Sequence, residues 1–186
     1  MEGIFNSNFD RFGNFYANVH NTFRWHENIN LQRLKNVFMK TIEKDLIARS
    51  TITIQAPVER VWEALVTPAL VKQYLHGTDV ESDWKVGSSV IFRGEWKGKS
   101  YEDKGEIKAI EKNKRLQYSF WSSLAGKEDS PANYVMVTYD LLPTARGTEL
   151  TISADDPNAD EQTKKHMEQN WDMVLQSLQK LLEATT

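Results

Sequence analysis

Hydrophobic and polar positions first alternate clearly in the segment STITIQAP. Ile52 and Ile54 are separated by polar residues there, which is the pattern of a strand with one buried face. Two helical patterns follow, because apolar residues share one face over residues 58–65 and again over residues 70–75, where Gly77 supplies a stop. The segment therefore predicts one strand and two short helices.

Prolines mark the start of both predicted helices. Pro57 ends the strand and can occupy the first turn of the first helix, where its missing N–H costs nothing. Thr67 is expected to cap the second helix, with Pro68 as its first residue.

A run of strands and one long helix are predicted after these helices. Five segments have strand patterns and short connections, which favours antiparallel pairing. They are SSVIFRGEW (88–96), YEDKGEIKAIEK (101–112), RLQYSFWSS (115–123), NYVMVTYDLL (133–142) and TELTISA (148–154). From about residue 158 to 183, apolar residues recur at spacings of four and three, which predicts a helix of roughly 38 Å that can cover the sheet.

Residues 1–38 differ from the rest of the chain. Aromatic residues recur there at helical spacing, whereas Gly13 and many asparagines disfavour a helix. We expect an accessory arm, helical or weakly ordered, next to a domain of residues 39–186. Two alternatives are a helix that binds a partner or forms a homodimer, and an upstream extension without a role.

Composition excludes several classes of function. The 186 residues include 40% hydrophobic and 26% charged residues, with a net charge of -3, which offers no basic field for nucleic acid or an anionic membrane. Cysteine is absent, so disulfides and thiolate metal sites are excluded. No apolar run is long enough to cross a membrane and no signal peptide is evident, so we expect a cytoplasmic protein.

Motifs that imitate catalytic or cofactor sites have simpler explanations. GEWKGKS has one residue too few between its glycines for a phosphate-binding loop. DPNADE lacks the glycine and the glutamate of a calcium loop, and we interpret Asp156, Asn158 and Asp160 as the polar start of the long helix. The four histidines form no metal-ligand pattern, and His76 is expected to end a helix. No metal, nucleotide or other cofactor is predicted.

The order of elements resembles the α+β helix-grip fold of the START-like superfamily, also called SRPBCC. In that fold a curved antiparallel sheet, here of about six strands, wraps around a long C-terminal helix. APVERVWEALVTPALVKQYL, WKVGSSVIFRGEW, YEDKGEI, RLQYSFWS, VTYDL and GTELTI are similar to the branch named for the activator of heat-shock protein 90 ATPase. The resemblance covers residues 45–185 and implies a cavity between the sheet and the long helix.

Aromatic residues are the candidate ligand contacts. Strand alternation gives several of them a common face, and the resemblance places that face toward the long helix. The predicted contacts are Phe92, Trp96, Asp103, Tyr118, Phe120, Tyr139 and Trp171. Each of these aromatics can instead be core packing, while Asp103 lies either at the cavity mouth or exposed at a strand end. The hydroxyls of Tyr118 and Tyr139 are expected to orient a ligand.

Three functions follow from the resemblance. The first is a carrier or sensor for a small hydrophobic or aromatic molecule. The second is a cyclase- or hydrolase-like enzyme in which Asp103, Tyr118 and His76 act in the same cavity, although the sequence assigns no catalytic residue. The third is a chaperone-interacting protein, for which we expect no ATPase stimulation because the 38-residue arm is shorter than the activators' N-terminal domain.

Overall fold

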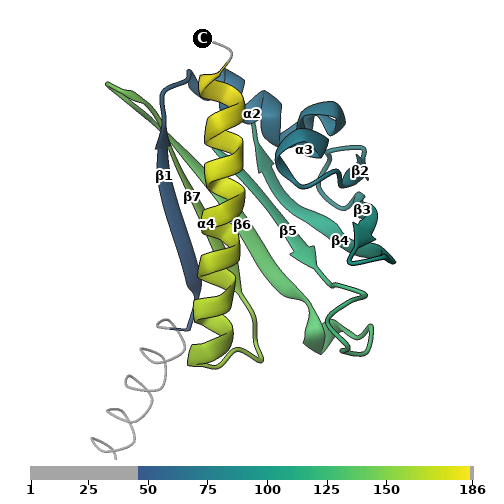
Figure 1. Cartoon of the computed structure of the whole chain (residues 1–186). Coiled ribbons are helices and arrows are strands. Elements are labelled where there is room, and N and C mark those ends of the chain that lie inside the picture. Colours follow the sequence, from purple (N-terminus) through teal and green to yellow (C-terminus); the bar gives the residue numbers. More distant parts are fainter. Residues whose placement is uncertain (1–45, 185–186) are drawn as a thin grey trace, which may run out of the picture. The chain divides into compact units, whose positions relative to one another are not determined.

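The protein forms an antiparallel sheet with one long helix on its concave face. The structure is a computed structural model that describes residues 46–184. Its elements, shown in Figure 1, are β1 (Ala48–Ile54), α2 (Val58–Val66), α3 (Pro68–Tyr74), β2 (Asp79–Ser82), β3 (Ser89–Trp96), β4 (Lys99–Glu111), β5 (Arg115–Phe120), the short helix η1 (Pro131–Asn133), β6 (Val135–Thr144), β7 (Gly147–Asp155) and α4 (Glu161–Glu183). The predicted arm of residues 1–38 and its boundary lie outside the described residues.

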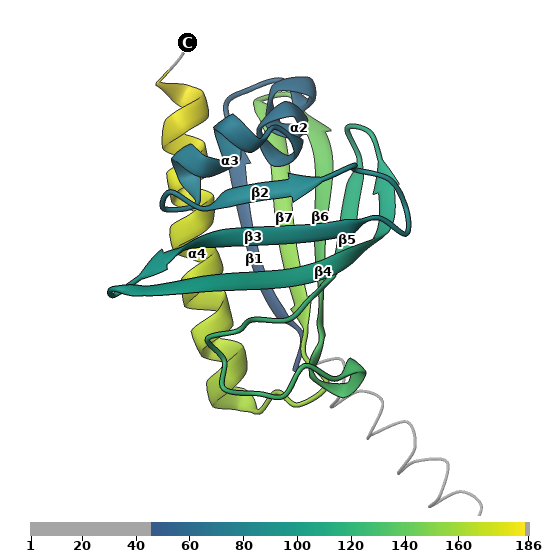
Figure 2. The ribbon, with the colours of Figure 1, turned by 90° about the vertical axis from the view of Figure 1, so that its right-hand side faces the viewer.

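The seven strands follow the order β1-β7-β6-β5-β4-β3-β2. Every pair is antiparallel, and chain neighbours pair directly except β1, which joins β7 at one edge with Ile54 opposite Thr148. Figure 2 shows β2, β3 and β4 running across the direction of β6, β7 and β1, so the sheet curls around α4. This confirms the predicted α+β helix-grip architecture.

The sheet bends sharply within β4. A register shift separates Ile107 from Ala109, and a side chain at Gly105 would place its Cβ atom 1.6 Å from the carbonyl oxygen of Ser119. Glycine is therefore required by close backbone approach, at the point where the two halves of the sheet change direction.

The helices begin nearly where the sequence predicts. Pro57 precedes α2 as its cap residue, and Pro68 is the first residue of α3. The side chain of Thr67 makes no capping hydrogen bond, although it stands at the predicted position. At the start of α4, the Asp160 carboxylate accepts a 2.7 Å hydrogen bond from the backbone N–H of Thr163. None of the described helices is long and apolar enough to cross a membrane.

Only the second half of α4 packs tightly onto the core. Its four buried residues are Val174, Leu175, Leu178 and Leu182. The same half is fastened to β1, because the Gln179 side chain donates to the carbonyl of Thr53 at 3.0 Å. From Glu161 to Met173 the helix buries no residue completely, so its first half leaves room above the sheet.

Candidate functional site

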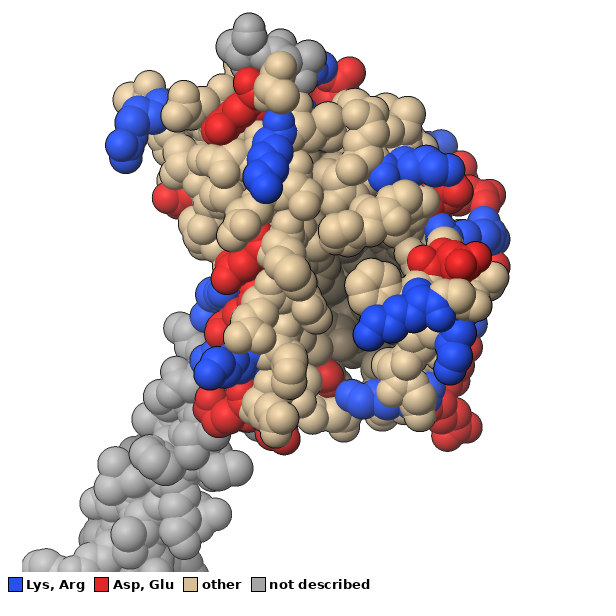
Figure 3. All heavy atoms as spheres, viewed as in Figure 1, with Lys and Arg blue, Asp and Glu red and all other residues tan. Residues whose placement is uncertain are grey.

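A cavity of about 450 Å³ lies between the first half of α4 and the sheet. Its floor comes from β5, β6 and β7, and the connection of residues 121–134 closes one side. In Figure 3 the molecular surface is hollowed beside α4. The volume falls within the usual range for small-molecule sites, roughly 300 to 1,000 Å³.

Most of the cavity wall is apolar. Val137 and Ala154 face each other across β6 and β7, as their register requires, and Phe120 ends the neighbouring strand β5. Trp171 and Val174 come from α4 on the opposite side. The cavity therefore offers apolar contact on two sides, which suits a flat or elongated hydrophobic group.

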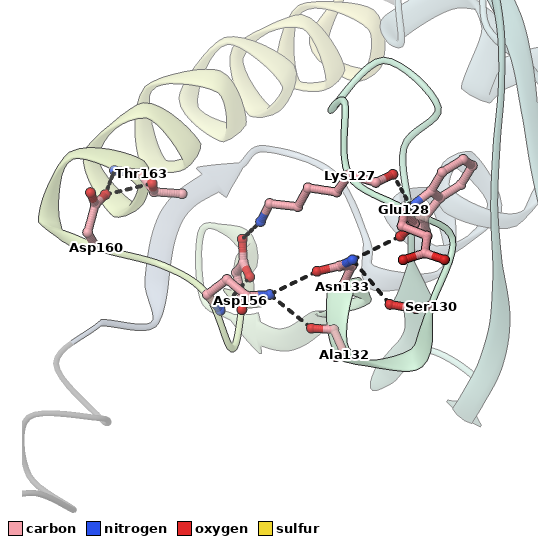
Figure 4. Close-up of polar contacts among 10 residues, drawn as sticks. Lys127, Glu128, Ser130, Ala132, Asn133, Asp156, Asp160 and Thr163 are labelled. Carbon is pink, nitrogen blue, oxygen red and sulfur yellow. Dashed lines mark hydrogen bonds and ion pairs between the residues drawn. The ribbon is translucent and has the colours of Figure 1, made fainter.

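One charged pair borders this apolar space. Nζ of Lys127 lies 3.3 Å from Oδ2 of Asp156, whose side chain is 3% exposed, against 39% for Lys127. The other carboxylate oxygen of Asp156 accepts a 2.8 Å hydrogen bond from the backbone N–H of Asn158. Burial of a carboxylate is costly unless it is paired, and these two donors supply the pairing. Figure 4 shows the contact between Lys127 and Asp156.

The connection that carries Lys127 is held in place by side chains. The indole N–H of Trp121 donates to the backbone carbonyls of Lys127 at 3.2 Å and Glu128 at 3.1 Å. The Asn133 amide donates to the same carbonyl of Glu128 at 2.9 Å. Asn158, in the β7–α4 connection, adds a 3.4 Å contact to Asn133. The polar wall is thus held by contacts within the protein.

A row of aromatic rings leads from the core to this cavity. Ring centroids are 5.8 Å apart for Phe92 and Tyr118, 6.0 Å for Tyr118 and Tyr139, and 6.1 Å for Tyr139 and Trp171. The space beside Phe92 and the two tyrosines is a gap of about 20 Å³, enough for about one water molecule. The hydroxyls of Tyr118 and Tyr139 lie 3.3 Å apart and bond to each other.

A second hollow of about 360 Å³ adjoins the cavity and shares Leu75 and Asn170 with it. Asp103 lies on its wall and is buried. The Asp103 carboxylate accepts hydrogen bonds from the backbone N–H of Ser123 at 2.8 Å and from its hydroxyl at 3.1 Å. Trp96 stands on the same wall but is 54% exposed, because it ends β3 at a hairpin tip.

The structure divides the seven predicted contacts among three places. Phe120 and Trp171 line the cavity beneath α4, while Phe92, Tyr118 and Tyr139 surround the small gap, and Trp96 and Asp103 line the second hollow. Contact with a ligand remains a prediction for each of them. His76 follows α3 with a left-handed backbone, φ 50°, and borders the second hollow.

Sequence reasoning missed the two charged residues of the cavity. It placed Asp156 with the polar start of the long helix, whereas Asp160 is the residue that caps α4 and Asp156 pairs with Lys127. Lys127 lies in a connection with no periodic pattern of apolar residues, so the sequence of that connection does not indicate that Lys127 faces a cavity.

The three residues weighed as a catalytic set lie in two different places. Within residues 46–184, no group of three or more His, Asp or Glu side chains could hold a metal ion. The proposed catalytic set does not share one cavity, because His76 and Asp103 line the second hollow and Tyr118 lines the small gap. An acid and a base must reach one reacting atom to act together.

Comparison with known proteins identifies the family. The family model described as Activator of Hsp90 ATPase homolog 1-like protein matches residues 55–183. The chain belongs to this family. No curated protein matches the chain.

Several solved structures share the fold. ChR145 from Cytophaga hutchinsonii is 47% identical, with a TM-score of 0.66 over 75% of this chain and 94% of its own. The Aha1 dimer from Colwellia psychrerythraea is 18% identical, with a TM-score of 0.59 over 74% of this chain and 96% of its own. DynU16, from the dynemicin biosynthetic locus, is 21% identical, with a TM-score of 0.64 over 75% of this chain and 48% of its own. At the two lower identities the likeness concerns the fold alone.

Proposed function

We propose that the protein binds a small, elongated hydrophobic molecule in the cavity beneath α4, as a carrier or sensor. The observation that carries this proposal is the cavity itself, which opens where the first half of α4 buries no residue completely and is walled mainly by apolar side chains. A domain selected for stability alone would be expected to close such a space, because interiors are normally packed to high density.

The binding test uses a neutral fluorescent probe, phenylnaphthylamine, whose emission rises in an apolar environment. Freshly purified protein should also be studied by native mass spectrometry for a molecule that co-purifies. We expect saturable probe binding at micromolar concentrations. The carrier proposal is wrong if no molecule co-purifies and the probe does not bind at tens of micromolar.

A pair of substitutions locates the probe. Ala125 is exposed and lines the cavity, so A125W should fill it from the connection without disturbing the core. Ala145 is exposed in the β6–β7 turn, away from the cavity, so A145W is the matched control. We expect A125W to weaken probe binding severalfold and A145W to leave it unchanged. Equal effects of both variants would place the probe elsewhere.

We also propose that the full chain forms a homodimer. The Colwellia protein of the same fold is a dimer. Sizing chromatography with light scattering measures the molar mass of the full chain in solution. A monomeric mass at all concentrations would reject the homodimer.

A further inference from the structure

The charged residues of the cavity beneath α4 lie together at one place in its wall, and this placement indicates which kind of ligand the cavity can bind. Among its described lining residues, Lys127 and Asp156 are the only charged ones, and they lie together. Figure 3 also shows several Lys and Arg side chains beside the hollow. A ligand with one polar end would therefore place that end near the pair and its apolar body under α4.

The two members of the pair differ in what they can still bind. Asp156 is almost fully covered, and both of its oxygens accept hydrogen bonds, one from Asn158 and one from Lys127. Lys127 is the more exposed member, and its contact with Asp156 is long, at 3.3 Å. An ammonium group has three donors, so two of them are not used by Asp156.

The backbone around Lys127 is fixed by a turn and by a side-chain hydrogen bond. Gly126 takes a left-handed conformation with φ 69°, which turns the chain immediately before Lys127. Trp121 then fixes the carbonyl of Lys127 by the indole hydrogen bond described above. A side chain on an ordered backbone loses less freedom when it binds, which favours affinity.

We propose that the cavity selects amphiphilic acids, with the ligand carboxylate on Nζ of Lys127 and its hydrocarbon part between Trp171 and the sheet. This inference rests on the proposed function and specifies its ligand class. A carboxylate would use the free donors of Lys127 in a charge-assisted hydrogen bond. An amine would meet a like charge at Lys127, and the Asp156 side chain is only 3% exposed and has both oxygens engaged by Lys127 and Asn158.

The test compares three ligands of equal chain length: decanoate, decanol and decylamine. Each displaces phenylnaphthylamine at neutral pH. For the natural protein we expect decanoate to bind about tenfold or more tightly than decanol, on the scale of one hydrogen bond to a charged group, and decylamine to bind most weakly.

Four variants assign the preference to Lys127. K127Q should remove the advantage of decanoate over decanol while the affinity for decanol stays unchanged, and K127R should keep the advantage. K165Q removes one charge from an exposed position of α4 outside the cavity and should behave like the natural protein. If K127Q fails to fold because Asp156 loses its partner, the double variant K127Q/D156N carries the same test.

The outcomes separate this inference from the proposed function. Equal binding of decanoate and decanol, or an advantage that survives in K127Q, overturns the acid preference while a binding cavity stands. If the probe and all three ligands fail to bind the natural protein, the proposed function is wrong and the acid preference with it.

Discussion

Alkaline pH should destabilise this domain steeply, because three tyrosines are buried around one small gap. Tyr74, Tyr118 and Tyr139 are 5%, 5% and 7% exposed. Burial raises the pKa of all three phenols above the ordinary value, since an ionised phenolate would lose its hydration there. The hydroxyl of Tyr139 lowers the pKa of Tyr118, but by less than burial raises it.

The magnitude follows from proton linkage. Below about pH 10, folded and unfolded chains both keep these protons, so the tyrosines do not affect the pH dependence. Above that value the unfolded chain releases them while the folded chain retains them. The free energy of unfolding then falls by about 1.4 kcal/mol per pH unit for each tyrosine, or about 4 kcal/mol per pH unit for all three. Because domains of this kind are stable by roughly 5–15 kcal/mol, one to a few pH units suffice for unfolding.

Urea unfolding followed by circular dichroism between about pH 9 and about pH 12 measures this slope. Y118F removes one titrating group and should reduce the slope by about 1.4 kcal/mol per pH unit. At neutral pH the same change costs about 1 kcal/mol, because it removes the hydrogen bond to Tyr139. The natural protein and Y118F contain the same lysines. The difference between their slopes of unfolding free energy against pH therefore measures the contribution of Tyr118. Identical slopes would refute the argument, because Tyr118 would then ionise in the folded protein as it does in the unfolded chain.

Three further changes test the fold. G105A should lower the free energy of unfolding by about 3 kcal/mol or more, because the new Cβ would collide with the backbone of Ser119. A decrease below about 0.5 kcal/mol in urea titration would contradict this close approach. T148V should cost about 1–2 kcal/mol because the buried hydroxyl donates to the carbonyl of Ala56 at 2.9 Å; an unchanged urea midpoint would show that this bond contributes nothing. A chain that lacks residues 1–38 should melt cooperatively at a temperature close to that of the full chain, and a large drop in calorimetry would show that the arm stabilises the domain.

The sequence predicted the order of elements well because that order depends on local patterns. Alternation located most of the strands, and the two prolines marked the helix starts. Strand β2 was missed, which is why about six strands were expected instead of seven. It has only four residues, of which Val80 alone is buried, so it contains too little alternation to stand out.

Alternation predicted which side of the sheet a residue faces but not how deep it lies. Tyr118 and Phe120 are on one face of β5, yet Tyr118 is in the core and Phe120 lines the cavity. The difference depends on where α4 stops packing tightly, near Val174, which no pattern within β5 encodes. Trp96 obeys the same alternation but extends past the covered part of the sheet.

Lys127 and Asp156 show why membership of the family does not fix the ligand. The space beneath α4 follows from the fold, because a helix of 23 residues buries side chains only in its second half. The charged pair, in contrast, comes from two connections that lie 29 residues apart in the chain. Connections tolerate substitution better than the sheet does, so the polar end of such a cavity can change while the fold persists. The connection of residues 121–134 is therefore the part of this domain where specificity for a head group can evolve at least cost to stability.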